Sequence, residues 1–301
     1  MSSETYKSFD LIIRSDELNL KYFEKYYGSD NYDLLIKEDN NLDFKCFWSK
    51  SNCSDLLITE EGVIVLIKDV GIFRIIEGKL ITWNKANNNV TEDDLITFLL
   101  GSVLSICLIQ RGLLVLHANA LEKDGKSIIC LGESGSGKST LACILMQQGW
   151  NLLADDLVAI NDQDFVLPGV SRIKLWANSL KELDIQTTNL EKVRPSIEKY
   201  HIPRQMLKKA NKPVKVNIIY LIERDPNSTD DKLHIKDIKD QKLSYLLIRE
   251  HIYKPFLMKI LGLESEYFKK LTKFQKIYPV KILKLPNNIL KTLKQLDSIN
   301  L

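Results

Sequence analysis

The sequence predicts a mixed α/β (α+β) fold with a small β-rich unit at its N-terminus. Short apolar or alternating runs, separated by glycine, aspartate and asparagine, fill the first 90 residues and are typical of a series of strands. From residue 91 onward, apolar runs of strand length alternate with segments of helical period. We therefore predict a β-rich N-terminal unit over 1–90 and a larger domain over 91–301.

The N-terminal unit shows no grouping of metal-ligating or nucleophilic side chains. Glu77-Gly78-Lys79 lies between two apolar runs and predicts a hairpin turn. The strands are expected at 9–13, 55–58, 63–67, 72–76 and 80–83.

The larger domain is expected to begin with a helix over 91–110. Thr91 provides the N-cap, and the acids at 92–94 suit the positive end of the helix dipole. A strand containing His117 should follow over 113–121, and Asp124-Gly125 should turn it into the strand 127–131.

The strand 127–131 leads into the sequence GESGSGKS at 132–139, which fits the pattern G-x-x-x-x-G-K-[ST]. Glycines allow such a loop to wrap a polyphosphate with its amide groups pointing inward, and the following helix presents its positive end. Lys138 should reach the β- and γ-phosphates, and the Ser139 hydroxyl should bind Mg²⁺. The motif predicts binding of a nucleoside triphosphate, assigned as ATP with Mg²⁺. The residues expected to bind it are Gly132, Glu133, Ser134, Gly135, Ser136, Gly137, Lys138, Ser139 and Thr140.

Two adjacent acids, Asp155 and Asp156, follow on the next strand-like run and are bracketed by apolar residues. Buried carboxylates beside a phosphate loop need a cation, which Mg²⁺ supplies. One acid is expected to hold the metal and the other to accept a proton from a hydroxyl group. Asp156 is predicted as a metal ligand together with Ser139, while the sequence leaves open which acid is the base.

Three further residues are weaker candidates. A lone histidine in an apolar strand, such as His117, is usually a core residue, but its strand should pair with the one that feeds the loop. Arg172 and Arg204 are candidates for contact with the transferred phosphate, with a structural or surface role as the alternative.

Composition argues against several classes of partner. The 42 basic and 39 acidic residues give a net charge of +3, too balanced to indicate nucleic acid or an anionic membrane. The segment 254–281 nevertheless carries seven lysines. Two interpretations stay open for it: a solvated helix surface, or a docking face for an acidic peptide.

The sequence also favours a cytoplasmic protein. Its five cysteines form no C-x-x-C pair, which argues against a disulfide framework. The first residues lack the features of a signal peptide, and the apolar segment 95–108 is too short to cross a bilayer as a helix.

The order and spacing of His117, the loop 132–139, Gly149 and Asp155-Asp156 resemble the C-terminal catalytic domain of bacterial HPr kinase/phosphorylase. The resemblance implies a P-loop core related to ATP-dependent phosphoenolpyruvate carboxykinase. It also implies that His117, Lys138, Asp155 and Asp156 are active-site residues. The acid of the family's second signature is not visible at 168–176, so the resemblance supports the kinase reaction and not its reversal.

The N-terminal 90 residues do not resemble that family. The layout is more similar to HPr kinase-like proteins encoded with peptide natural products, including kinases of lasso-peptide precursors. We therefore expect an ATP- and Mg²⁺-dependent kinase that phosphorylates a serine of a small protein or peptide. A small-molecule hydroxyl kinase and an ATP-binding regulatory module are the alternatives. The related kinases assemble as rings, so a homo-oligomer is one possibility that the resemblance raises, but the sequence identifies no interface and leaves the oligomeric state open.

Overall fold

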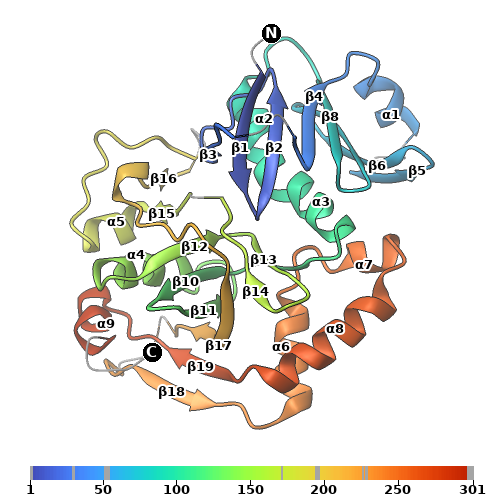
Figure 1. The fold of residues 1–301 in the computed structure, drawn as a ribbon. Helices are drawn as coiled ribbons and strands as arrows, with labels where there is room; N and C mark the ends of the chain where they lie inside the picture. The colour runs from blue at the N-terminus through green and yellow to red at the C-terminus, as the bar shows by residue number, and fades with distance from the viewer. Residues whose placement is uncertain are drawn as a thin grey trace. The chain divides into compact units, whose positions relative to one another are not determined.

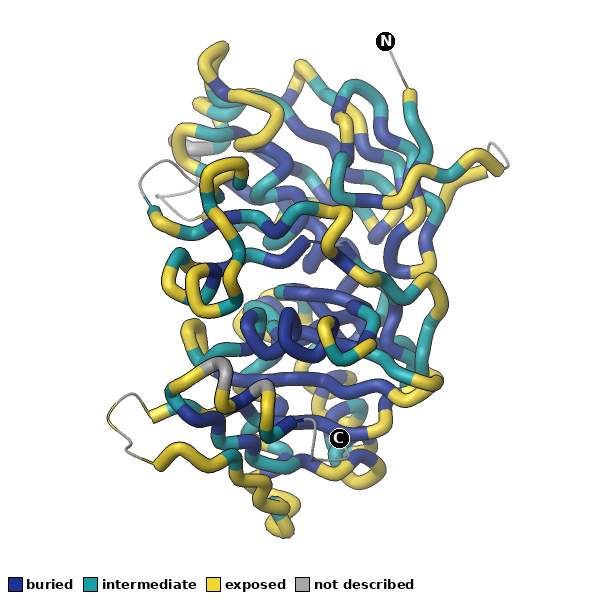
Figure 2. Tube along the Cα trace, turned by 90° about the vertical axis from the view of Figure 1, so that its left-hand side faces the viewer, coloured by how far each residue is buried: buried dark blue, intermediate teal, exposed yellow. Residues whose placement is uncertain are grey.

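The computed structural model describes residues 3–28, 31–50, 55–170, 172–193, 197–225, 227 and 230–296. The chain has a mixed α+β fold with several sheets and divides into two compact units, 1–115 and 116–301 (Figure 1). Buried positions, dark blue in Figure 2, concentrate inside each unit, whereas loops are largely exposed.

The first unit is built on an eight-stranded sheet whose order is β3-β1-β2-β4-β8-β7-β6-β5. Its strands are β1 (Ser3–Ser8), β2 (Leu11–Asp16), β3 (Glu24–Lys25), β4 (Leu34–Glu38), β5 (Leu56–Thr59), β6 (Gly62–Ile67), β7 (Gly71–Ile76) and β8 (Leu80–Lys85). Its helices are α1 (Phe44–Lys50), α2 (Glu92–Phe98), a π-helical turn (Leu99–Val103) and α3 (Leu104–Gln110).

Two hairpin turns of this unit bear on the sequence predictions. The predicted turn between β7 and β8 is confirmed, since Glu77 and Gly78 both have positive φ, at 49° and 65°. Residues 9 and 10, expected in a strand, form the turn between β1 and β2 instead. Phe9 and Asp10 both have positive φ, at 53° and 57°.

The boundary between the units differs from the predicted one. The helix over 91–110, capped as expected by Thr91, belongs to the first unit rather than opening the second. Its C-terminal end is held by the β7–β8 turn: the Gly78 amide donates to Gln110 Oε1 at 2.7 Å, and Arg111 donates to the Gly78 carbonyl at 2.8 Å. These hydrogen bonds join residues more than 30 positions apart, so local sequence carries no sign of them.

The second unit contains a nine-stranded sheet in the order β12-β10-β11-β17-β14-β13-β9, with β19 beside β17 and β18 beside β19. A separate two-stranded ribbon is formed by β15 (Lys174–Trp176) and β16 (Lys199–His201). The strands of the larger sheet are β9 (Leu114–Leu116), β10 (Asn119–Lys123), β11 (Lys126–Leu131), β12 (Asn151–Asp155), β13 (Val158–Ile160), β14 (Phe165–Val166), β17 (Val214–Glu223), β18 (His234–Asp237) and β19 (Val280–Lys284). The helices are α4 (Lys138–Gln147), α5 (Ala177–Glu182), a 3₁₀ turn (Arg204–Met206), α6 (Gln241–Glu250), α7 (Phe256–Ile260), α8 (Glu264–Ile277) and α9 (Ile289–Leu296).

The arrangement of β10, β11 and β12 brings distant segments to one edge of the sheet. Strand β10 is antiparallel to both neighbours, and Asn119 at its start lies opposite Cys130 of β11 and Asp155 of β12. The beginning of β10 therefore meets the ends of β11 and β12. Strand β17 runs parallel to β11 and also ends at this edge. The loops that follow β11, β12 and β17, and the residues that precede β10, therefore lie at the same edge of the sheet.

Candidate active site

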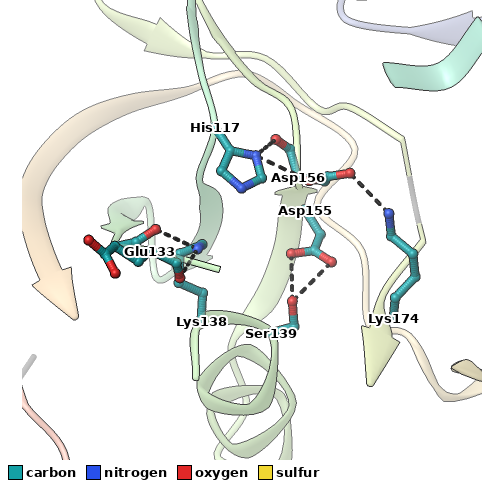
Figure 3. A network of polar contacts seen from close by, with 8 residues as sticks. His117, Glu133, Lys138, Ser139, Asp155, Asp156 and Lys174 are labelled. Carbon is teal, nitrogen blue, oxygen red and sulfur yellow. Dashed lines mark hydrogen bonds and ion pairs between the residues drawn. The ribbon is translucent and has the colours of Figure 1, made fainter. Parts of the chain in front are cut away.

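The loop between β11 and α4 has the predicted strand–loop–helix context. Gly132, Gly135 and Gly137 all adopt positive φ, at 146°, 89° and 100°, a region that side chains with a Cβ rarely enter. The Lys138 ammonium reaches back over the loop and donates to the carbonyls of Gly132 at 2.6 Å and Glu133 at 2.9 Å (Figure 3). The pKa of Lys138 is lowered by burial, which the negative charges of the two nearby aspartates only partly offset.

Gly132 should not tolerate even one additional methyl group. A Cβ at this position would lie 2.7 Å from Ser136 Oγ and 2.8 Å from the Ile222 backbone carbonyl oxygen, so the loop would have to shift. We expect Gly132→Ala to weaken nucleotide binding by about tenfold or more, measured by titration with a fluorescent ATP analogue. Gly125→Ala is the matched control, because Gly125 also has positive φ, at 77°, but has no atom within 4 Å of the added Cβ. Equal losses in the two variants would contradict this explanation.

The two acids at the end of β12 point in different directions (Figure 3). The Ser139 hydroxyl donates to the Asp155 carboxylate, at 3.3 and 3.4 Å from its two oxygens. Asp156 has φ of 73°, which turns the chain at the strand end. Its carboxylate lies 3.2 Å from His117 Nδ1 and 3.0 Å from Lys174 Nζ. The residue beside Ser139 is thus Asp155, and the predicted metal ligand Asp156 faces His117 and Lys174 instead.

The two carboxyl groups differ in their readiness to ionise. Burial, reinforced by the neighbouring charge of Asp156, raises the pKa of Asp155 to about 6. Burial alone would raise the pKa of Asp156 as well, but the hydrogen bond with His117 and the charge of Lys174 hold it below its ordinary value. Ionisation of Asp155 therefore costs more than usual and is favoured by a nearby cation, whereas Asp156 stays ionised with its protein partners.

The raised pKa of Asp155 predicts a specific pH dependence of stability in the metal-free protein. Between the ordinary pKa of 3.8 and about 6, the folded state binds more protons at Asp155 than the unfolded state does. The contribution of Asp155 to the free energy of unfolding therefore falls as the pH rises through this range. The favourable contribution of Asp156 is instead lost as the pH falls through and below about 4. In Asp155→Asn the side chain stays neutral at every pH. The free energy of unfolding of this variant, relative to the wild type, should therefore increase by up to about 3 kcal/mol as the pH rises from about 4 to 7.

Denaturant unfolding of both proteins in EDTA, at about pH 4 and pH 7, measures this difference. A stability difference between the two proteins that does not change with pH would show that burial does not raise the pKa of Asp155.

His117 lies in the short break between β9 and β10, and not within a continuous strand as predicted. Its backbone amide donates to the His251 carbonyl at 2.7 Å, and its ring meets the Tyr253 ring edge-on at 5.9 Å between centroids. Its Nδ1 also lies 3.2 Å from the Asp156 backbone carbonyl oxygen. The contacts with His251 and Tyr253 on one side and with Asp156 on the other therefore fix the position of His117.

One pocket collects these groups. It is lined by the loop and α4 residues Ser134, Gly135, Gly137, Lys138, Ser139 and Thr140, by His117, Asp155 and Asp156, and by Lys174, Leu175, Trp176, Ser179, Lys199 and Arg224. Four cationic side chains thus surround two carboxylates, which gives the pocket a positive excess. Such an excess suits a triphosphate.

Sequence reasoning missed three of the cations, Lys174, Lys199 and Arg224. Lys174 and Lys199 come from opposite strands of the β15–β16 ribbon. Burial and the charge of Lys174 lower the pKa of Lys199, and its ammonium lies 5.4 Å from the centre of the Trp176 ring. Arg224 directly follows β17, whose apolar run was predicted. This strand ends at the same sheet edge as β11, so the position of Arg224 after it could have identified this residue as a candidate.

Arg172 and Arg204 are not among the residues that line this pocket. Arg172 is buried at 8% exposure, and Arg204 is exposed on the 3₁₀ turn. Their predicted contact with phosphate gains no support from the geometry.

The described residues contain no group of three or more His, Cys, Asp or Glu side chains that could hold a metal ion. The Ser139–Asp155 pair fits Mg²⁺ nonetheless, because this ion commonly takes one or two protein ligands and completes its shell with phosphates and water. Within the part of the chain that the structure describes, no helix is both long and apolar enough to cross a membrane.

No family model and no curated protein sequence matches this chain. Among solved structures, the chain is similar to the HPr(Ser) kinase/phosphatase from Coxiella burnetii, with 15% identity and a TM-score of 0.30. The match covers 61% of this chain and 94% of that chain. At this TM-score the likeness carries no argument about activity, which has to come from the site itself.

Proposed function

We propose that the second unit is an ATP- and Mg²⁺-dependent kinase that phosphorylates a serine hydroxyl of a small protein or peptide. The observation that carries the proposal is the convergence of two side-chain pairs on the phosphate loop: Ser139 with Asp155, and His117 with Asp156. The first pair suits a metal ion and the second suits a hydroxyl acceptor. A triphosphate-binding protein without phosphoryl transfer has no need of the second pair.

The loop itself supports phosphate binding. The Ser136 hydroxyl is buried and has no hydrogen-bond partner within the described residues, as expected for a group that binds an anion. The Lys138 ammonium would exchange its loop carbonyls for phosphate oxygens, to which it binds more strongly because they are charged. Ser139 and Asp155 would hold Mg²⁺, which when bound neutralises charge on the phosphates.

Asp156 is assigned as the base. His117 and Lys174 fix its carboxylate and keep it ionised, so it can accept a hydrogen bond from the acceptor hydroxyl. Phosphoryl transfer passes through a loose transition state, in which positioning of the nucleophile contributes more than strong basicity. The lowered pKa of Asp156 is therefore compatible with this role.

The choice of a serine in a polypeptide rests on the resemblance of the stretch from His117 to Asp156 to HPr kinases. Incubation with γ-labelled ATP, Mg²⁺ and a panel of serine peptides, the protein HPr and free serine tests it. Label on a peptide or protein supports the proposal, with alanine-substituted peptides as the control. Label on free serine alone indicates a small-molecule kinase. ATP binding with no label anywhere indicates a regulatory module, and either of these last results contradicts the proposal.

A further inference from the structure

Helices α6, α7 and α8 pack together in the second unit (Figure 1). Residues of these helices and of the segment 252–255 line a groove that is separate from the pocket described above. The floor, as we call the buried part of its lining, is apolar and consists of side chains that are at most 5% exposed, and two less buried aromatic rings also line the groove. The floor residues are Ile252, Met258, Tyr267 and Leu271, and the rings are Tyr245 and Phe268. The rings meet edge-on with centroids 5.7 Å apart, and Phe268 is 58% exposed.

Several large apolar side chains are exposed on these helices: Leu243, Leu246, Phe256, Ile260, Phe268 and Ile277. Of these, Phe268 lines the groove. Single exposed apolar residues are ordinary, so the feature that marks this place is the exposed Phe268 ring beside a buried apolar lining.

The same helices concentrate positive charge. Residues 241–277 carry eight Lys or Arg and three Asp or Glu, an excess that is larger than the net charge of +3 on the whole chain. Lys270 already pairs with Asp162 at 2.9 Å. Two cations, Arg249 and Lys269, and one carboxylate, Glu264, line the groove. Within the described residues, neither cation is in an ion pair with an acidic side chain. The groove therefore offers apolar contact area and an excess of positive charge.

The groove is joined to the active site through residues 251–253. Ile252 of its floor pairs with Leu116, the residue before His117. The flanking residues His251 and Tyr253 contact His117 itself, through a backbone hydrogen bond and a ring contact. A chain seated in the groove lies one short segment away from the residue that positions Asp156.

We propose that this groove docks an acidic segment of the acceptor polypeptide that also carries apolar side chains and is separate from the phosphorylated serine. Charge complementarity with Arg249 and Lys269 selects the acidic residues, and the aromatic-walled floor receives the apolar ones. The identification of the occupant as the acceptor rests on the proposed function. Binding in the groove does not depend on it.

Fluorescence anisotropy with the full chain and no nucleotide tests the docking. The probe is a labelled peptide of alternating Glu and Leu, and the comparison probe has Lys in place of Glu. We expect only the acidic peptide to bind, with an affinity that falls as salt is added. Phe268→Ala and Lys269→Glu should each weaken binding by about tenfold or more. Ile277→Ala and Lys276→Glu are the matched controls, because these exposed residues lie on the same helix but do not line the groove.

Failure of the acidic peptide to bind, or equal losses in the control variants, overturns the proposal. Light scattering distinguishes a second occupant: a dimer that Phe268→Ala dissociates, with no peptide binding, identifies the groove as a contact between copies of this chain. The labelled-ATP assay is scored separately. Groove binding without any phosphoryl transfer contradicts the kinase proposal only, and transfer without groove binding contradicts the docking proposal only.

Discussion

Asp156→Asn is expected to lower phosphoryl transfer by about 10²–10⁴-fold while nucleotide binding is retained. The substitution keeps the shape of the side chain but removes the charge that accepts the hydroxyl proton. It also weakens the contacts with His117 at 3.2 Å and Lys174 at 3.0 Å, which orient the group. The transfer rate is measured with labelled ATP, and binding with a fluorescent ATP analogue.

Asp184→Asn is a matched control for this variant. Asp184 also has positive φ, at 56°, so the same substitution is made in the same backbone conformation but outside the pocket. Wild-type turnover in Asp156→Asn would remove this carboxylate from the mechanism. An equal loss in the control would assign the effect to the backbone instead.

Lys138→Met is expected to reduce both nucleotide affinity and transfer, the latter by about 10²–10³-fold or more. Methionine retains an unbranched apolar side chain of similar length, so the loss of the cation is the principal change. Lys138 is buried, at 9% exposure, and its ammonium lies at the loop where the β- and γ-phosphates are expected. Loss of affinity distinguishes this variant from Asp156→Asn, in which affinity is kept.

Lys123→Met controls for the loss of a lysine hydrogen bond. The Lys123 ammonium also donates to a backbone carbonyl, that of Gln148 at 2.9 Å, but it does not line the pocket. Thermal unfolding of both variants checks that any loss of activity does not come from loss of fold. Unchanged nucleotide affinity in Lys138→Met would contradict the assignment of the loop.

Some features of the site could be predicted because short sequence spacing determines them. The loop requires residues that tolerate positive φ, and the structure places positive φ at Gly132, Gly135 and Gly137. The Asp124-Gly125 turn was predicted for the same reason, with φ of 52° and 77°. The hairpin it forms brings the start of β10, and with it His117, to the end of β11.

Other features depend on contacts between distant parts of the chain. The boundary at residue 90 was misplaced because the β7–β8 turn, distant in sequence, holds the C-terminal end of the helix that follows. Lys174 and Lys199 reach the pocket through the pairing of β15 with β16, and no local pattern marks them.

By itself, the sequence determined the phosphate loop, the acidic pair and the strands around them, because backbone conformation and apolar periodicity are local properties. Only the tertiary structure decided the separate directions of the two acids. The positive φ of Asp156 turns the chain between them, so that Asp155 meets Ser139 while Asp156 meets His117 and Lys174. Adjacent residues in sequence thereby acquire different partners and different pKa values, because ionisation depends on surroundings that the fold assembles.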